Sequence, residues 1–125
     1  MFCLTSSLED YLEIIYILSE QGLKVGITDI AKALVVSKPS ATKAIKILKN
    51  ENLVSQEKYG KILLTKEGEK AAVAVYDKHK VISKFLNKVL GVSEKTAEID
   101  ACKIEHILSK ETVNGIKNYL ENVKM

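Results

Sequence analysis

The chain has 125 residues, 46% hydrophobic and 28% charged, a composition typical of a folded globular protein. Its net charge of +3 at pH 7 is too small to identify a partner, and no apolar run is long enough to span a bilayer. The first residues lack the basic and apolar segments of a secretory signal, so we expect a cytoplasmic protein. Cys3 and Cys102 fit neither a disulfide framework nor a Cys-x-x-Cys motif, so free thiols are expected.

Positive charge is concentrated in one segment of the chain. Residues 38–66 hold seven lysines and two glutamates, which gives this segment a charge of +5. A local basic surface of this kind favours a polyanionic partner. Because the chain contains no arginine, the commonest reader of guanine, any DNA readout must use Lys, Ser, Thr, Asn or Gln.

Apolar residues at helical spacing predict two helices in the N-terminal part of the chain. The first is expected to follow a cap at Ser6 or Ser7 and to end at Gly22. Thr28 is expected to cap the second helix, which residues 35–37 connect to a third. Two helices that meet across so short a turn predict a helix-turn-helix.

The third helix and the segment after it complete the pattern of a winged helix. Ser37 is the expected N-cap, and Pro39 lies in the first turn, where its missing N–H does no harm. The runs 53–57 and 61–64 favour β-strands, and the glycine-containing loop between them predicts a hairpin, the wing. In this architecture the second helix of the motif reads base edges while other side chains contact phosphates. The expected DNA-contacting residues are Ser37, Pro39, Ser40, Thr42, Lys43 and Lys46 in the helix, with Lys58 and Lys61 in the wing.

Three further helices are predicted after the wing. A long helical pattern runs from Thr65 to Gly91, and shorter ones begin at Ser93 and at Ser109 or Lys110. The expected fold is therefore mainly α, with a winged helix-turn-helix domain over residues 1–72 and an all-helical domain over residues 73–125. A homodimer is expected, because one winged helix reads few base pairs and the apolar stripes of the later helices need a partner.

Residues of the types that bind metals occur on three of the predicted helices. Two acidic residues share one face of the first helix by their spacing, and a cysteine, a glutamate and a histidine share one face of the fifth. A further histidine interrupts the apolar stripe of the long helix. Each also has an ordinary interpretation, as solvent-facing acids, a core cysteine or a hydrogen-bonded core histidine. These candidates are Asp10 and Glu13 in the first helix, His79 in the long helix, and Cys102, Glu105 and His106 in the fifth.

Several motifs spread over nearly the whole chain carry a family resemblance. They are Leu8-Glu9-Asp10-Tyr11-Leu12-Glu13, Ile30-Ala31, Ser37-Lys38-Pro39-Ser40-Ala41-Thr42, Leu63-Leu64-Thr65-Lys66-Glu67-Gly68, His79 ahead of Phe85-Leu86, and Ile104-Glu105-His106. With them the chain resembles the metal-dependent repressors that include the diphtheria toxin repressor and the manganese transport regulator. The resemblance implies a repressor of metal uptake that binds double-stranded operator DNA as a homodimer, with no membrane and no small-molecule substrate. It also implies that all six candidates ligate a divalent metal between the first helix and the second domain.

The resemblance is mixed in detail. The chain ends at Met125, so we expect the short two-domain form, without the additional C-terminal domain of larger members. Asp10 matches the manganese type, whereas Cys102 matches the iron type. Ser83 and Glu98 depart from the iron type's ancillary site, which has a carboxylate and a histidine there. Since oxygen ligands suit manganese and a thiolate favours later metals, Mn2+ or Fe2+ is expected, with Co2+ or Zn2+ able to bind in vitro.

Two other functions remain as alternatives. A winged-helix regulator could respond to an organic ligand or to thiol oxidation, and metal-dependent DNA binding would separate it from the metal-responsive repressor. An enzyme built on Cys102 and His106 is not expected, because the two share one helix with no orienting partner or substrate cleft.

Overall fold

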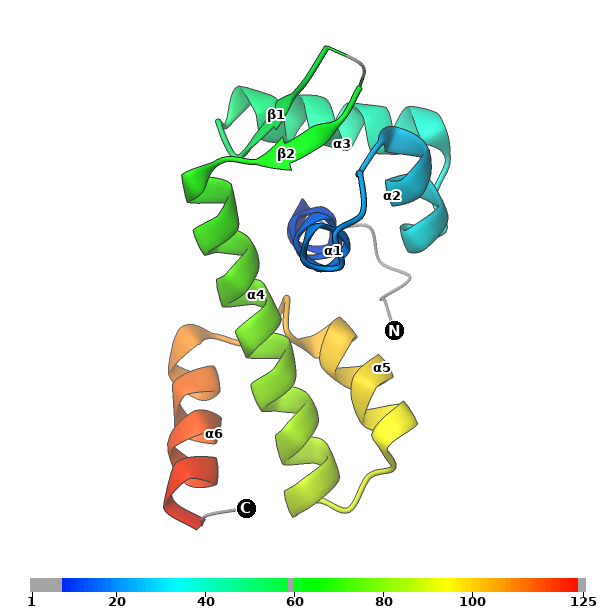
Figure 1. Ribbon diagram of the computed structural model, residues 1–125. Helices are drawn as coiled ribbons and strands as arrows, with labels where there is room; N and C mark the ends of the chain where they lie inside the picture. The colour runs from blue at the N-terminus through cyan, green and yellow to red at the C-terminus, as the bar shows by residue number, and fades with distance from the viewer. Residues whose placement is uncertain (1–7, 59, 124–125) are drawn as a thin grey trace. The chain divides into compact units, whose positions relative to one another are not determined.

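The computed structural model describes residues 8–58 and 60–123, which form helices and one small hairpin. In chain order these are α1 (Leu8–Glu20), α2 (Ile27–Leu34), α3 (Lys38–Asn50), β1 (Val54–Gln56), β2 (Ile62–Leu64), α4 (Lys66–Lys84), the π-helical turn η1 (Phe85–Val89), α5 (Glu94–Ile104) and α6 (Lys110–Val123). The described residues divide into an N-terminal unit, 8–74, and a C-terminal unit, 75–123, with α4 contributing to both (Figure 1). No helix in these ranges has the length and apolar character needed to cross a membrane. The predicted mainly α fold is confirmed.

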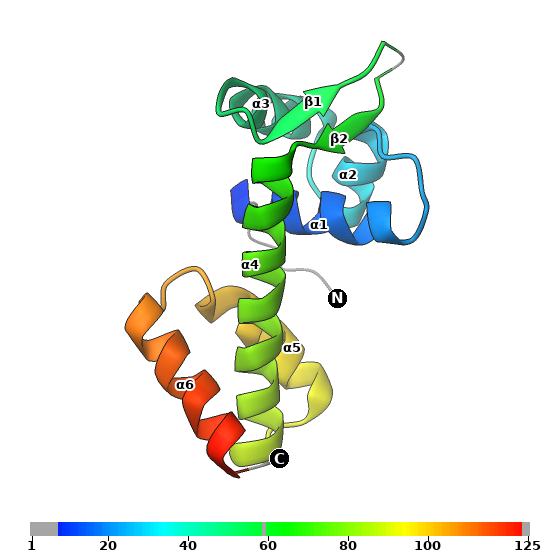
Figure 2. The same ribbon diagram turned by 60° about the vertical axis from the view of Figure 1, so that its left-hand side comes forward.

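The N-terminal unit packs three helices and the hairpin around one apolar core. The stripe predicted on the third helix is buried: Ala41, Ile45 and Leu48 are at most 2% exposed. The strands pair antiparallel, with Val54 opposite Leu64. The hairpin, which is the predicted wing, lies beside α3, the helix predicted to read base edges (Figures 1 and 2). Both therefore belong to the same packed unit.

The N-terminus of α3 is built as the sequence predicts. Ser37 Oγ accepts the Ser40 N–H at 3.2 Å, and Pro39 occupies the first turn. The turn before it is closed by two hydrogen bonds, from the Val35 N–H to the Lys32 carbonyl at 3.3 Å and from the Val36 N–H to the Ala31 carbonyl at 3.0 Å. The tight helix-turn-helix connection is therefore confirmed.

The predicted cap of the second helix is wrong. α2 begins at Ile27, two residues earlier than a Thr28 cap would allow, and its N-cap is Gly26. Asp29 Oδ2 reaches back to accept the Gly26 N–H at 2.9 Å, so this carboxylate supplies the oxygen expected from Thr28. The cap predicted at Ser6 or Ser7 lies outside the described residues.

A close backbone contact fixes the start of α4 to the end of α3. Thr65 Oγ1 donates to the Asn52 carbonyl at 2.7 Å and accepts the Gly68 N–H at 3.0 Å. A Cβ at Gly68 would lie 1.8 Å from the Leu53 carbonyl oxygen, so only glycine allows this approach. The residues that follow β2 are thereby held against the segment that precedes β1.

The C-terminal unit consists of the second half of α4 with α5 and α6 beside it (Figures 1 and 2). Its core includes Val75, Ile82, Ala101 and Leu120, all of them buried. The predicted starts of the last two helices are confirmed, since α5 follows a Ser93 cap and α6 begins at Lys110.

Two features of this unit differ from the prediction. The long helix does not stay α-helical up to Gly91, because η1 adds a π turn in which the Leu90 N–H bonds to the Phe85 carbonyl at 3.3 Å. The fifth helix ends at Ile104, so Glu105 and His106 lie in the turn that follows and not on the helix as predicted. The N–H of Glu105 still bonds to the Ala101 carbonyl at 3.0 Å, which keeps this residue in line with the last helical turn.

Candidate functional site

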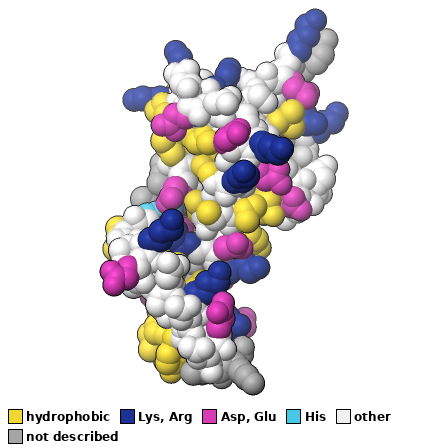
Figure 3. Space-filling model, turned by 90° about the vertical axis from the view of Figure 1, so that its left-hand side faces the viewer, with side chains coloured by type: hydrophobic (Ala, Val, Ile, Leu, Met, Phe, Trp, Pro, Cys, Tyr) yellow, Lys and Arg dark blue, Asp and Glu magenta, His cyan; other side chains and the backbone are white. Residues whose placement is uncertain are grey.

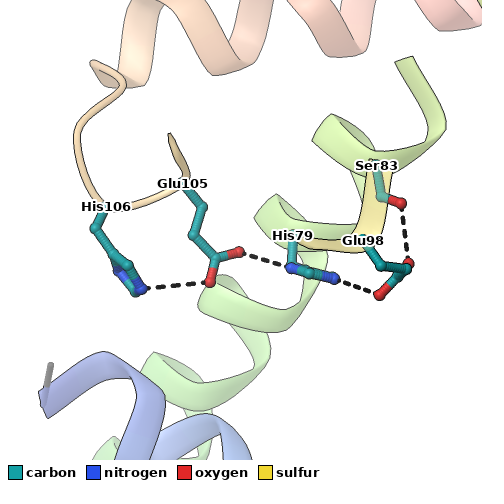
Figure 4. A network of polar contacts seen from close by, with 5 residues as sticks. All are labelled: His79, Ser83, Glu98, Glu105 and His106. Carbon is teal, nitrogen blue, oxygen red and sulfur yellow. Dashed lines mark hydrogen bonds and ion pairs between the residues drawn. The ribbon is translucent and has the colours of Figure 1, made fainter. Parts of the chain in front are cut away.

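His79 lies buried between two carboxylates in the C-terminal unit (Figure 4). Its Nδ1 is 3.1 Å from Glu105 Oε2, and its Nε2 is 2.8 Å from Glu98 Oε2. The second oxygen of Glu98 accepts the Ser83 hydroxyl at 2.9 Å. His79 and Ser83 are one turn apart on α4, and Glu98, Cys102 and Glu105 follow one another at intervals of four and three residues, so two helix faces supply the whole network.

The two carboxylates decide the charge of this histidine. Burial by itself lowers the pKa of His79, but the hydrogen bonds to Glu105 and Glu98 outweigh burial and raise the pKa to about 9. Burial works against the charged form of Glu98 too, and the hydrogen bonds from His79 and Ser83 overcome it and lower the pKa of Glu98. At neutral pH the imidazole of His79 is therefore protonated in the metal-free protein.

The stability of the metal-free protein should consequently depend on His79 at alkaline pH. Because the pKa rises from the ordinary 6.5 to about 9 on folding, the contribution is complete below pH 6.5 and is lost as the pH rises through 9. Unfolding by urea with a chelator present, at pH 6 and pH 9.5, should show the parent losing roughly 3 kcal/mol more than His79→Gln over this interval. Parallel losses in the two proteins would contradict the charged network.

One carboxylate oxygen of Glu105 is buried without a hydrogen bond from the described residues. The side chain of Glu105 is fully buried, and the oxygen in question is its Oε1. The Nε2 of His106 lies 3.5 Å from this oxygen, an ion-pair contact that is long for a hydrogen bond. A buried carboxylate oxygen left in this state costs on the order of 1–3 kcal/mol or more, and a bound cation would remove that cost.

A group of donor atoms surrounds this carboxylate. Ligand atoms of His79, Cys102 and Glu105, called here the donor group, lie within 4.8 Å of one another. An imidazole, a thiolate and a carboxylate together suit a divalent transition metal, so the residues fit a metal ion.

The state of Cys102 adds a condition to this fit. Cys102 is buried and disulfide-bonded in the structure, so the expectation of a free thiol is wrong for this residue. Cys3 lies outside the described residues. Only the thiolate ligates metals, so Cys102 must be reduced before it can complete the donor group.

The remaining predicted ligands lie on α1 and in the turn after α5. Asp10 and Glu13 belong to the N-terminal unit, one helical turn apart, and are only 3% and 6% exposed. Such burial is unusual for carboxylates, which ordinarily face solvent. His106 follows Glu105 directly and is half-buried.

The predicted DNA-contacting residues lie on the surface of the N-terminal unit. All six residues of the helix are exposed, namely Ser37, Pro39, Ser40, Thr42, Lys43 and Lys46. In the wing, Lys58 is exposed and Lys61 is half-buried. Figure 3 shows lysine side chains projecting from the outer edge of this unit, at the top of the view. This surface offers both polar side chains for base edges and positive charge for phosphates.

One contact that orders this surface was not predicted from the sequence. Lys49 Nζ donates to Gln56 Oε1 at 3.3 Å, and Gln56 Nε2 donates to the Gly60 carbonyl at 3.4 Å. Gln56 thus links the recognition helix to the loop of the wing. An exposed polar residue on a strand gives no sequence pattern that would indicate such a role.

Two family descriptions together match almost the whole chain. "Iron dependent repressor, N-terminal DNA binding domain" matches residues 3–62, and "Iron dependent repressor, metal binding and dimerisation domain" matches residues 65–125. The chain belongs to the iron-dependent repressor family. Its members are transcriptional regulators, which confirms the family predicted from the motifs and the expectation that the protein is not an enzyme.

Two HTH-type transcriptional regulators align over most of the chain. An uncharacterised HTH-type transcriptional regulator of Methanocaldococcus jannaschii is 39% identical over 122 residues, covering 97% of this chain and 98% of that protein. The HTH-type transcriptional regulator MntR of Geobacillus kaustophilus is 36% identical over 117 residues, covering 94% of this chain and 82% of that protein.

Solved structures of the family superpose on the chain as well. The manganese regulator SloR matches with a TM-score of 0.84 and 36% identity, over 94% of this chain and 54% of that one. A manganese-dependent transcriptional repressor in complex with manganese matches with a TM-score of 0.86 and 28% identity, over 92% and 53% of the two chains. The chain therefore spans about half the length of these two solved proteins.

Proposed function

We propose that the protein is a transcriptional repressor that a divalent metal activates to bind operator DNA as a homodimer, and that it controls genes for metal uptake. The observation that carries the proposal is the donor group around Glu105, whose buried Oε1 accepts no hydrogen bond within the described residues, in a chain whose other unit exposes a recognition helix. Similarity to a manganese regulator and to a manganese-dependent transcriptional repressor supports it. Because a repressor must reach its operator, we propose a cytoplasmic location.

We propose that residues of both domains are metal ligands. His79, Cys102, Glu105 and His106 supply ligands from the C-terminal domain, residues 73–125. Asp10 and Glu13 supply carboxylates from the DNA-binding domain, residues 1–72. Metal binding favours the dimer geometry in which two recognition helices enter successive major grooves, so DNA affinity reports metal concentration. Mn2+ and Fe2+ are the proposed physiological metals, because the ligand set mixes hard oxygens with one sulfur.

The homodimer is proposed to form through the C-terminal domain. Three large apolar side chains of this unit are exposed in the single chain: Leu90 (58%), Ile107 (79%) and Tyr119 (46%). A second copy would cover apolar surface of this kind. Two-fold symmetry of the dimer then implies an operator that is an imperfect palindrome.

The proposal is tested by selecting DNA from a random duplex library with reduced protein. The selection is run under anaerobic conditions in buffered Mn2+, in buffered Fe2+ and in chelator. We expect an enriched palindrome with metal and none with chelator. Enrichment of the same sequence in chelator would favour the regulator of an organic ligand or of thiol oxidation instead, and no enrichment in any condition would reject the repressor.

Mutations should separate base recognition from phosphate contacts. Lys58→Ala and Lys61→Ala should weaken binding to all sequences alike and reduce the salt dependence by about one phosphate contact each. Thr42→Ala and Lys43→Ala should relax discrimination at particular base pairs, by about 1–3 kcal/mol per lost base contact. Fluorescence anisotropy on operator and mismatched duplexes over a salt series measures both effects.

Lys95→Ala, on an exposed position of α5, is the matched control for loss of one positive charge. It should change neither the affinity nor the salt dependence. If it weakened binding as much as the wing variants do, the wing lysines would act only through the overall charge of the protein.

A further inference from the structure

The two ring nitrogens of His79 face different kinds of partner (Figure 4). Nδ1 points to Glu105, a fully buried member of the donor group. Nε2 points to Glu98, whose side chain is 40% exposed and which belongs to no metal-binding group within the described residues. One side of the imidazole therefore faces the proposed metal site, and the other faces a hydrogen-bonding pair outside it.

The pair on the outer side is arranged to hold a ring N–H. Glu98 uses Oε2 for His79 and Oε1 for the Ser83 hydroxyl, at 2.8 and 2.9 Å, so both oxygens are occupied and the carboxylate is fixed in orientation. A carboxylate in this position is an acceptor and keeps the proton on Nε2. A nitrogen that carries a proton has no lone pair for a metal, and the opposite nitrogen becomes the ligand.

We infer that Glu98 and Ser83 are positioning residues of the metal site, which hold the Nε2–H of His79 so that Nδ1 is the metal-binding nitrogen. In the iron-type repressors that the chain resembles, the positions of Ser83 and Glu98 belong to an ancillary metal site. In this chain Glu98 forms hydrogen bonds with Ser83 and with His79 instead. The imidazole of His79 then ligates one metal ion, through Nδ1, and cannot ligate a second one through Nε2. This inference rests on the proposed function, since it assigns roles around the same site.

The nitrogen assignment is tested by NMR on the untagged full chain, which contains only two histidines. Protein labelled with 15N-histidine is reduced and loaded with 113Cd2+, and the signals of His79 are assigned by comparison with His106→Gln. We expect 113Cd–15N coupling at Nδ1 of His79 and a retained proton at Nε2. Coupling at Nε2, or coupling of both nitrogens to cadmium, would overturn the inference.

Variants of the positioning pair supply a second readout. Glu98→Ala should weaken Mn2+ binding about 10–100-fold, and Ser83→Ala should weaken it less, because outer partners of ligating histidines have effects of this size. Glu98→Gln should restore much of the affinity, since the amide oxygen still accepts the Nε2–H and the hydroxyl of Ser83 can accept the amide hydrogen. Asp100→Asn, an exposed carboxylate on the same helix, is the charge-matched control and should change nothing.

Metal stoichiometry separates positioning from ligation. If Glu98 ligated a second metal, Glu98→Ala would lower the number of ions bound per chain and glutamine would not restore it. That result would overturn the inference while leaving the repressor intact. A parent protein that binds no divalent metal in the same titration would instead reject the proposed function together with the inference.

Discussion

Glu105→Gln should abolish metal-dependent operator binding while leaving the fold intact. The carboxylate is fully buried, its Oε2 lies 3.1 Å from His79 Nδ1, and its Oε1 has no hydrogen bond in the described part of the chain. Glutamine keeps the shape of the side chain but removes the negative charge that would hold a cation. Because even partners outside the ligand shell change metal affinity about 10–100-fold, we expect a loss on the order of 100-fold or more for a ligand. The measurement is the Mn2+ concentration at half-maximal operator binding.

Glu111→Gln is the matched control for this prediction, because Glu111 is an exposed carboxylate on α6 of the same unit. It should respond to Mn2+ as the parent does. Thermal unfolding of all three proteins in chelator checks that the fold is kept. An unchanged metal response in Glu105→Gln would mean that the ion is held without this residue, and the site would have to be rebuilt around the other candidates.

The elements whose residues interact locally were predictable from the sequence. Ser37 and Pro39 act within the first turn of α3, and the buried stripe of α3 repeats at helical spacing, so the local pattern was enough to predict the helix. The wing was predictable for the same reason, since a glycine-containing loop joins two short β-forming runs. Such patterns hold wherever a segment has one buried face.

Competition between neighbouring residues limited the prediction of helix ends. Both Thr28 and Asp29 offer an oxygen near the start of α2, and the sequence does not say that the Asp29 carboxylate reaches Gly26 first. Likewise, the i, i+4 pattern that includes His106 continues beyond Ile104 in the sequence although the helix ends there. Backbone geometry at a helix end depends on the segment that follows, which periodicity does not describe.

The polar network illustrates a different limit. Glu98 and His79 are nineteen residues apart, and their 2.8 Å contact depends on how α5 packs against α4. The intervals from Glu98 to Cys102 and Glu105 place the three residues in line on one helix face. This spacing is the sequence pattern that could have indicated the polar network around His79. The sequence supplied the residue types, and tertiary packing decided which of them meet.

Metal binding should require reduction of Cys102. The sulfur is disulfide-bonded in the structure, and a disulfide sulfur is not a thiolate ligand. Co2+ added to protein treated with a non-coordinating phosphine reductant should give an intense sulfur-to-metal charge-transfer band in the near ultraviolet, and untreated protein should give none. Cys3→Ala retains the band if Cys102 is its source. A band that persists in Cys102→Ala would assign it to Cys3 and contradict the prediction.

Cys102→Glu should remove the reductant requirement and change the choice of metal. A carboxylate cannot be oxidised to a disulfide, and it makes the donor group all nitrogen and oxygen, which suits manganese better than a thiolate does. The metal concentration at half-maximal operator binding should therefore shift toward Mn2+ relative to Fe2+ or Co2+, and Asp10→Met should shift it the opposite way. The ranking among variants is the informative quantity, because absolute affinity rises from manganese to copper for nearly any site. If both variants kept the parent's ranking and the parent gave no charge-transfer band when reduced, Cys102 would be a core residue, and the carboxylates and histidines would hold the metal alone.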